Sequence, residues 1–130
     1  MTDLTDQQFE LSILHDARVE EFVFRGDCVQ LGLTLDTGKR ARGLLDGVYD
    51  CVARGNVAHT IIDDLEVLRL NSTNVQAAVR SMRALDADAI RGLDRSIGDV
   101  WTREGLTWVK LIPSQGMAFQ AACRSFRMKL

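Results

Sequence analysis

Two histidines stand near aspartates in this sequence, and these residue types could do acid–base or metal chemistry. His15 is followed directly by Asp16, as a general base and its orienting carboxylate would be. Adjacent residues of a strand face opposite ways, so the two side chains are not expected to bond to each other. We therefore expect Asp16 to bond to backbone in a turn and His15 to be a polar residue at a strand edge.

A divalent metal is the alternative use of these residues. His59, Asp63 and Asp64 lie close together in the chain, and His15 would join them from a neighbouring strand. A metal site needs three or four ligands that converge, and this spacing does not match the fixed patterns of zinc or calcium motifs. Solvated edge residues are the simpler interpretation of this cluster, and a small metal-dependent enzyme or ligand-binding domain built on these four residues is kept as the alternative function.

The sequence lacks the phosphate-loop, dinucleotide, hydrolase and zincin motifs. An enzyme is therefore the less favoured class, and no cofactor is expected. Cys28, Cys51 and Cys123 form an odd set without Cys-x-x-Cys spacing, which predicts buried, reduced thiols. The tripeptide Arg25-Gly26-Asp27 matches an adhesion motif, but it fits the tight turn of a hairpin, in which Gly26 supplies a positive φ.

The bulk composition is that of a single globular domain. The chain has 130 residues, 46% of them hydrophobic and 26% charged. Its polar, acidic start and the lack of a long apolar run predict a cytoplasmic protein with no membrane contact. The net charge of −2 divides unevenly, since residues 1–70 carry 13 acidic and 7 basic side chains and residues 71–130 carry 5 and 9.

Periodicity of two predicts strands over most of the chain. The expected strands are 9–14, 18–25, 28–35, 59–70, 106–112 and 117–128, the last with a phase change near Ser125. Residues 113–116 are expected to form a turn, and so are residues 36–38. Residues 41–52 have helical apolar spacing but carry Gly43 and Gly47, so a strand is favoured and a helix stays open.

Two helices are expected in the middle of the chain. The first places four apolar residues on one side, at Val75, Ala78, Val79 and Met82. The second begins at Asp86, contains Ala89, Ile90, Leu93 and Ile97, and ends at Gly98. Residues 1–130 are thus one α+β domain, mainly an antiparallel sheet with a two-helix insert (about 72–97) packed on one face. We expect the insert to cover the side that bears Val29, Leu31, Leu33 and Leu35.

Basic and aromatic residues of the second half are candidates for binding. The basic residues Arg80, Arg83, Arg91, Arg95, Arg124, Arg127 and Lys129 could follow a phosphate backbone. Interleaved aspartates and few aromatic residues favour a solvated surface instead, so no nucleic-acid partner is expected. Trp101 and Trp108 are interpreted as core residues, with an exposed anchor for a partner as the alternative.

The stretch "ELSILHDARVEEFVFRGDCVQLGLTL" resembles the opening of small bacterial proteins in which Leu-His-Asp-Ala or Leu-His-Asp-Ser leads into a hairpin. Some of these are immunity-type proteins of toxin systems. The resemblance implies a non-catalytic protein-interaction domain that neutralises a toxin by binding it. A basic toxin would suit an acidic face, and a homodimer through a strand edge is also compatible. The expected partner-binding residues are Asp46, Asp50, Asp63, Asp64, Glu66, Trp101 and Trp108.

Overall fold

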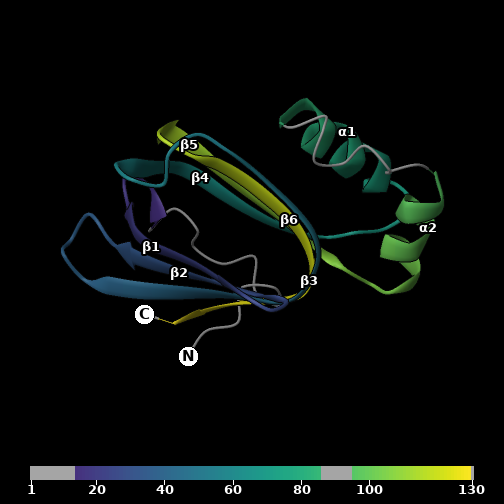
Figure 1. Cartoon of the computed structure of the whole chain (residues 1–130), viewed down its shortest axis with the longest axis horizontal. Helices are drawn as coiled ribbons and strands as arrows, with labels where there is room; N and C mark the ends of the chain where they lie inside the picture. The colour runs from purple at the N-terminus through teal and green to yellow at the C-terminus, as the bar shows by residue number, and fades with distance from the viewer. Residues whose placement is uncertain (1–13, 86–94, 130) are drawn as a thin grey trace.

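The computed structural model describes residues 14–85 and 95–129 and contains six strands and two helices. Every strand pair is antiparallel, and the sheet closes into a barrel with the order β1-β2-β3-β6-β5-β4 (Figure 1). The predicted α+β class, mainly antiparallel sheet with a two-helix insert, is confirmed. In chain order the elements are β1 (Arg18–Arg25), β2 (Cys28–Thr34), β3 (Arg40–Arg54), β4 (Thr60–Arg69), α1 (Val75–Leu85), α2 (Arg95–Arg103), β5 (Thr107–Gln115) and β6 (Ala118–Lys129).

The β1–β2 hairpin confirms the interpretation of Arg25-Gly26-Asp27 as a turn. Arg25 pairs with Cys28, so Gly26 and Asp27 form the loop, and Gly26 has a φ of 62°. A side chain would make that backbone conformation costly. The turn predicted at residues 36–38 is also present, closed by a bond from the Gly38 N–H to the Leu35 carbonyl at 2.8 Å.

Residues 41–52, which fitted either a strand or a helix, belong to β3. This strand pairs with β2 at residues 40–45 along one edge and with β6 at residues 42–54 along the other, so the section where these ranges overlap is bonded on both sides and the second half of the strand is held by β6. Pairing with neighbouring strands thus decides the secondary structure of a segment whose apolar spacing fits both a strand and a helix.

The apolar residues form two cores on opposite sides of the sheet. The first lies inside the barrel and includes Val29, Leu31 and Leu33. The second lies outside the barrel, where α1 and α2 cover Val52, Trp108 and Ala122. The prediction that the helices would cover the Val29 side is therefore wrong. The sheet buries that side by closing on itself, and the helices cover its outer face instead, at one side of the molecule (Figure 1).

The second helix does not end at Gly98 as predicted, because Gly98 lies inside α2. A Cβ at this position would lie 3.1 Å from the side-chain nitrogen of Gln76 and 3.7 Å from a methyl carbon of Val75, so Gly98 lies on the side of α2 that faces α1. The helix continues to Arg103 and buries Trp101, which is 1% exposed. The insert therefore extends beyond residue 97. The other residues expected in this helix, Asp86, Ala89, Ile90 and Leu93, lie outside the described residues.

The turn predicted at residues 113–116 is shorter than expected, since β5 continues to Gln115 and the chain turns at Gly116. Pro113 is tolerated in the strand because it faces Ile62 at a register shift, where the ladder is already interrupted. In β6 the buried face changes phase between Cys123 and Phe126, as predicted. The strand expected at 9–14 lies outside the described residues except for Leu14, which is in a turn. Neither described helix has the length and apolar character to cross a membrane.

Candidate functional site

The four residues of the predicted metal site do not converge. His15 lies near Asp63, with Nδ1 2.9 Å from the Asp63 carbonyl oxygen and 3.7 Å from its carboxylate. His59 occupies the loop before β4 with a φ of 65°, and its carbonyl accepts a bond from the side-chain amide of Gln115 at 3.1 Å. In the described part of the chain, the one group of three potential ligands contains none of these residues. The metal-dependent hypothesis on this set is therefore not supported.

His15 and Asp16 form a turn rather than a strand edge, which corrects the expected geometry. Asp16 has a φ of 66°, and its carboxylate lies 3.7 Å from His15 Nε2. The bond to the Asp63 carbonyl, helped by the Asp16 charge, raises the pKa of His15 above 6.5. Because both side chains are more than half exposed, water screens this pair, and it resembles a surface contact more than a catalytic dyad.

The acidic residues expected to form one face are divided between two strands. Asp46 and Asp50 lie on β3, and Asp63, Asp64 and Glu66 lie on β4. In the strand order β1-β2-β3-β6-β5-β4, β3 and β4 are three strands apart in either direction around the ring. The two groups therefore lie on opposite sides of the barrel, which corrects the expectation of a single acidic face. Glu66 also faces Lys110 across the β4–β5 pair.

The two tryptophans are core residues, as favoured from the sequence. Trp101 is 1% exposed and Trp108 is 7% exposed, and both belong to the core beneath the helices. Each indole N–H has a partner, Asp50 Oδ2 at 3.2 Å for Trp101 and Gln120 Oε1 at 3.0 Å for Trp108. Because both side chains are buried, the alternative prediction that they form an exposed anchor for a partner is wrong.

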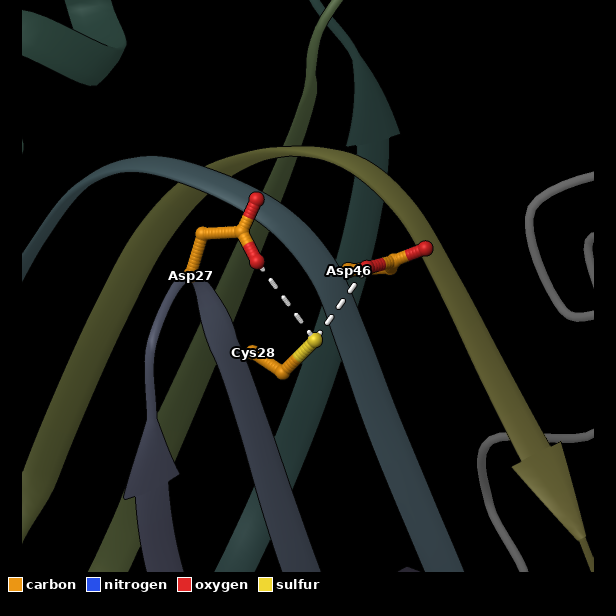
Figure 2. Close-up of side chains that lie close together, drawn as sticks. All are labelled: Asp27, Cys28 and Asp46. Atoms are coloured by element: carbon orange, nitrogen blue, oxygen red, sulfur yellow. Dashed lines mark hydrogen bonds between the residues drawn. The ribbon is translucent and has the colours of Figure 1, made fainter.

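The three ligand-type side chains that do converge are Asp27, Cys28 and Asp46 (Figure 2). The hairpin turn supplies Asp27, and β2 and β3 place Cys28 beside Asp46. The Cys28 thiol points between the carboxylates, with Sγ 3.2 Å from Asp46 Oδ1 and 3.7 Å from Asp27 Oδ1. The bond to Asp46 is the main reason why the pKa of Cys28 lies above 9.0. The thiol is thus held in its protonated form, whereas a metal ligand or a nucleophile must be a thiolate.

The prediction of buried thiols is correct for one cysteine only. Cys123 is buried in the barrel, and burial raises its pKa to about 12. Cys28 and Cys51 are partly exposed. For Cys51 burial and the nearby Asp50 charge raise the pKa as well. All three cysteines are free.

A groove of about 600 Å3 lies on the outer face of the sheet, across the side of the barrel formed by β1, β2 and β3, and reaches the end of β6. Its basic side chains are Arg40, Arg42 and Lys129. An adjoining hollow of about 160 Å3 shares Arg42 and Lys129 and adds Arg127. We call these four residues the basic cluster.

The arrangement of the basic cluster is electrostatically unfavourable in the protein alone. Arg42 and Lys129 face each other directly across the β3–β6 pair, and like charges in that position are destabilising. Among the described residues, no carboxylate oxygen lies within 4.0 Å of any of the four basic side chains. An anionic ligand would relieve this repulsion.

Two features of the neighbouring strands shape the groove. The register of β1 shifts between Val19 and Glu21, and this bulge leaves Glu20 and Glu21 both exposed at the rim. Opposite Glu21 stands Gly32, where a Cβ would lie only 3.0 Å from the Glu21 Cβ. The glycine therefore accommodates the bulge and leaves only backbone at its own position on the floor of the groove, next to the small side chain of Thr34.

The sequence did not reveal the basic cluster because its members come from distant segments. Arg40 and Arg42 belong to the acidic half of the chain, and Arg127 and Lys129 belong to the basic half. The available signal was the alternation of Arg40 with Arg42 and of Arg127 with Lys129, which places each pair on one strand face. The chain matches no protein-family model, no curated protein and no solved structure.

Proposed function

We propose that the protein is a non-catalytic domain that binds an acidic segment of a partner protein in the groove. The observation that carries this proposal is the basic cluster, in which Arg42 and Lys129 face each other with no carboxylate oxygen of the described residues within 4.0 Å of either. Complementary charge across an interface favours encounter and fixes the orientation of the partner. A cytoplasmic location, consistent with three free thiols, is part of the proposal.

An immunity-type role is the specific form of this function that the resemblance at residues 14–17 implies. In that form the partner is a toxin, and its docking surface has to carry acidic side chains. A basic toxin would need one acidic face, whereas the acidic candidates are divided between β3 and β4. If a toxin gene lies beside this one, the wild-type chain is expected to inhibit the toxin, and a chain with a disrupted basic cluster is not.

The test is a binding measurement with a defined acidic peptide. A fluorescein-labelled Glu-Ser-Glu-Ser-Glu-Ser peptide is titrated with the wild-type protein and with the Arg42→Glu/Lys129→Glu variant, and its anisotropy is followed. We expect the variant to bind about tenfold more weakly, since attractive charges become repulsive, and the wild-type affinity to fall as salt is added.

The matched control reverses the charge at two exposed arginines of α1, in the variant Arg80→Glu/Arg83→Glu. It changes the net charge by the same amount as Arg42→Glu/Lys129→Glu does. This control is expected to bind the peptide almost as the wild-type protein does. Equal weakening in both variants would mean that net charge, rather than the groove, attracts the peptide. No binding to the wild-type protein would refute the proposal directly.

A further inference from the structure

We infer that the groove receives an extended segment in which acidic and basic side chains alternate, as in Glu-Lys-Glu-Lys. This inference rests on the proposed function and specifies the kind of segment that the partner presents. It follows from the opposite charges on the two sides of the groove at Gly32, from the small residues Gly32 and Thr34 between those sides and from the spacing of the cationic residues.

The two sides of the groove have opposite charge. The β1 side carries Glu20 and Glu21, both exposed by the bulge. The β3 side carries Arg40 and Arg42, and Lys129 lies beyond Arg42 on β6. Between them runs β2, where Gly32 offers only backbone to a ligand and Thr34 adds a small side chain with a hydroxyl. At Gly32, a ligand lying over β2 therefore meets the carboxylates of β1 on one side and the cations of β3 and β6 on the other. One step along, beside Thr34, the β1 residue is the exposed Arg18.

An extended chain suits this arrangement because its side chains alternate between two sides. If the extended partner segment lies along β2 with its side chains directed across the strands of the sheet, every second side chain points toward β3 and the others point toward β1. Arg40 and Arg42 are two residues apart, or about 6.6 Å along the strand, which equals the repeat of a peptide with an acidic residue at every second position.

The same features disfavour a nucleic acid as the occupant. A phosphate backbone carries a single sign of charge, and Glu20 and Glu21 would repel it. Single-stranded nucleic acids also stack their bases on aromatic side chains. The exposed large apolar residues of the described chain are Phe24, Tyr49 and Leu68, and none of them lines the groove.

The experiment compares labelled peptides of identical composition. Glu-Lys-Glu-Lys-Glu-Lys and Glu-Glu-Glu-Lys-Lys-Lys have the same net charge and differ only in order. We expect the wild-type protein to bind the alternating peptide about threefold to tenfold more tightly, because only this order pairs both sides of the groove. A labelled oligothymidylate of six nucleotides serves as the nucleic-acid probe and is expected to bind more weakly than either of the two Glu-Lys peptides.

A second variant removes the acidic side while leaving the cations in place. Glu20→Gln/Glu21→Gln is expected to bind both isomers equally and to bind the Glu-Ser peptide at least as tightly as the wild-type protein does, because two repelling carboxylates are removed. The control Asp63→Asn/Asp64→Asn, which alters two exposed carboxylates of β4, is expected to keep the preference. Circular dichroism checks the fold of each variant. If Glu20→Gln/Glu21→Gln does not fold, the comparison of the two isomers on the wild-type protein alone decides whether the inference holds.

The outcomes separate the inference from the proposed function. If the wild-type protein binds the Glu-Ser peptide but does not distinguish the isomers, the inference is wrong and the proposed function stands. If the oligothymidylate binds more tightly than the alternating peptide, the occupant is a nucleic acid and the inference is overturned. If none of the peptides binds, both the inference and the proposed function are wrong.

Discussion

The thiol of Cys28 shows how a single side chain takes its properties from neighbours on other strands. It lies on the outer face of β2, since Val29 beside it is buried in the barrel, and Asp46 of β3 lies 3.2 Å from its sulfur. The carboxylate accepts the S–H proton and repels the negative thiolate. Both effects raise the pKa of Cys28, so only a small fraction is nucleophilic at neutral pH.

Removing the Asp46 charge should therefore make Cys28 more reactive. In the Asp46→Asn variant we expect the pKa of Cys28 to fall and its alkylation by iodoacetamide at pH 8 to become faster, since the thiolate is the reacting species. Peptide mapping by mass spectrometry reads Cys28 separately from Cys51 and Cys123. The matched control is Asp64→Asn, on the opposite side of the barrel, and it should leave the rate unchanged. An unchanged rate in Asp46→Asn would show that the hydrogen bond does not control this thiol.

At the scale of elements, the sequence predicted most strands because each depends on a local pattern. Alternating apolar residues in β2, together with the Gly26 turn, are enough to define the first hairpin. Strand order depends on contacts between distant residues, and nothing local in β3 specifies that Arg42 faces Lys129. For this reason the strand face of each basic residue was predictable, whereas the groove was not.

The helix α2 was misplaced for a similar reason. Gly98 resembled a helix end because glycine is unfavourable within helices, by about 1 kcal/mol relative to alanine. In the fold, burial of Trp101 and close packing against α1 outweigh that cost. The Trp101 indole also donates to Asp50 of β3 at 3.2 Å, which connects α2 to the barrel.

This connection makes stability depend on pH at Asp50. Burial raises the pKa of Asp50 above 3.8, and the bond from Trp101 offsets only part of that rise. A raised pKa in the folded state means that ionising Asp50 costs stability as the pH rises from about 3.8 through the folded-state value. The Asp50→Asn variant cannot ionise, and its amide oxygen still accepts the indole N–H. We therefore expect the variant to gain stability relative to the wild type as the pH rises through this range.

Urea denaturation at pH 3, 5 and 7 measures the effect. The free energy of unfolding of Asp50→Asn minus that of the wild type should be larger at pH 7 than at pH 3, because the variant is then relatively more stable. Asp64→Asn provides an exposed carboxylate for comparison and should show no such trend. If both variants change with pH in the same way, Asp50 is not the group responsible.

In the molecule as a whole, the outer face of the long strands β3 and β6 has two regions, one covered by the helices and one open. Toward one end, Val52 and Ala122 lie under the helices. Toward the other, the outer face carries Arg42 and Lys129 and is open at the groove. The inner face of the sheet carries the first core, and its outer face carries the second core under the helices. The outer face of one closed barrel therefore has a region covered by helices and a region that is free.

Because the second core lies outside the barrel, the helices should open without unfolding the barrel. Met82 of α1 is fully buried in the second core, and Leu31 of β2 is fully buried in the first. Replacing either with alanine should cost about 2–5 kcal/mol, but the cost should fall on different parts of the molecule. In Met82→Ala, amide hydrogen exchange is expected to rise at least about tenfold in α1 and α2 and to change little in β2. In Leu31→Ala it should rise in the barrel strands as well. If exchange in β2 rose with that in the helices in Met82→Ala, the two cores would unfold as one cooperative unit, and the free surface at the groove could not be altered independently of the helical layer.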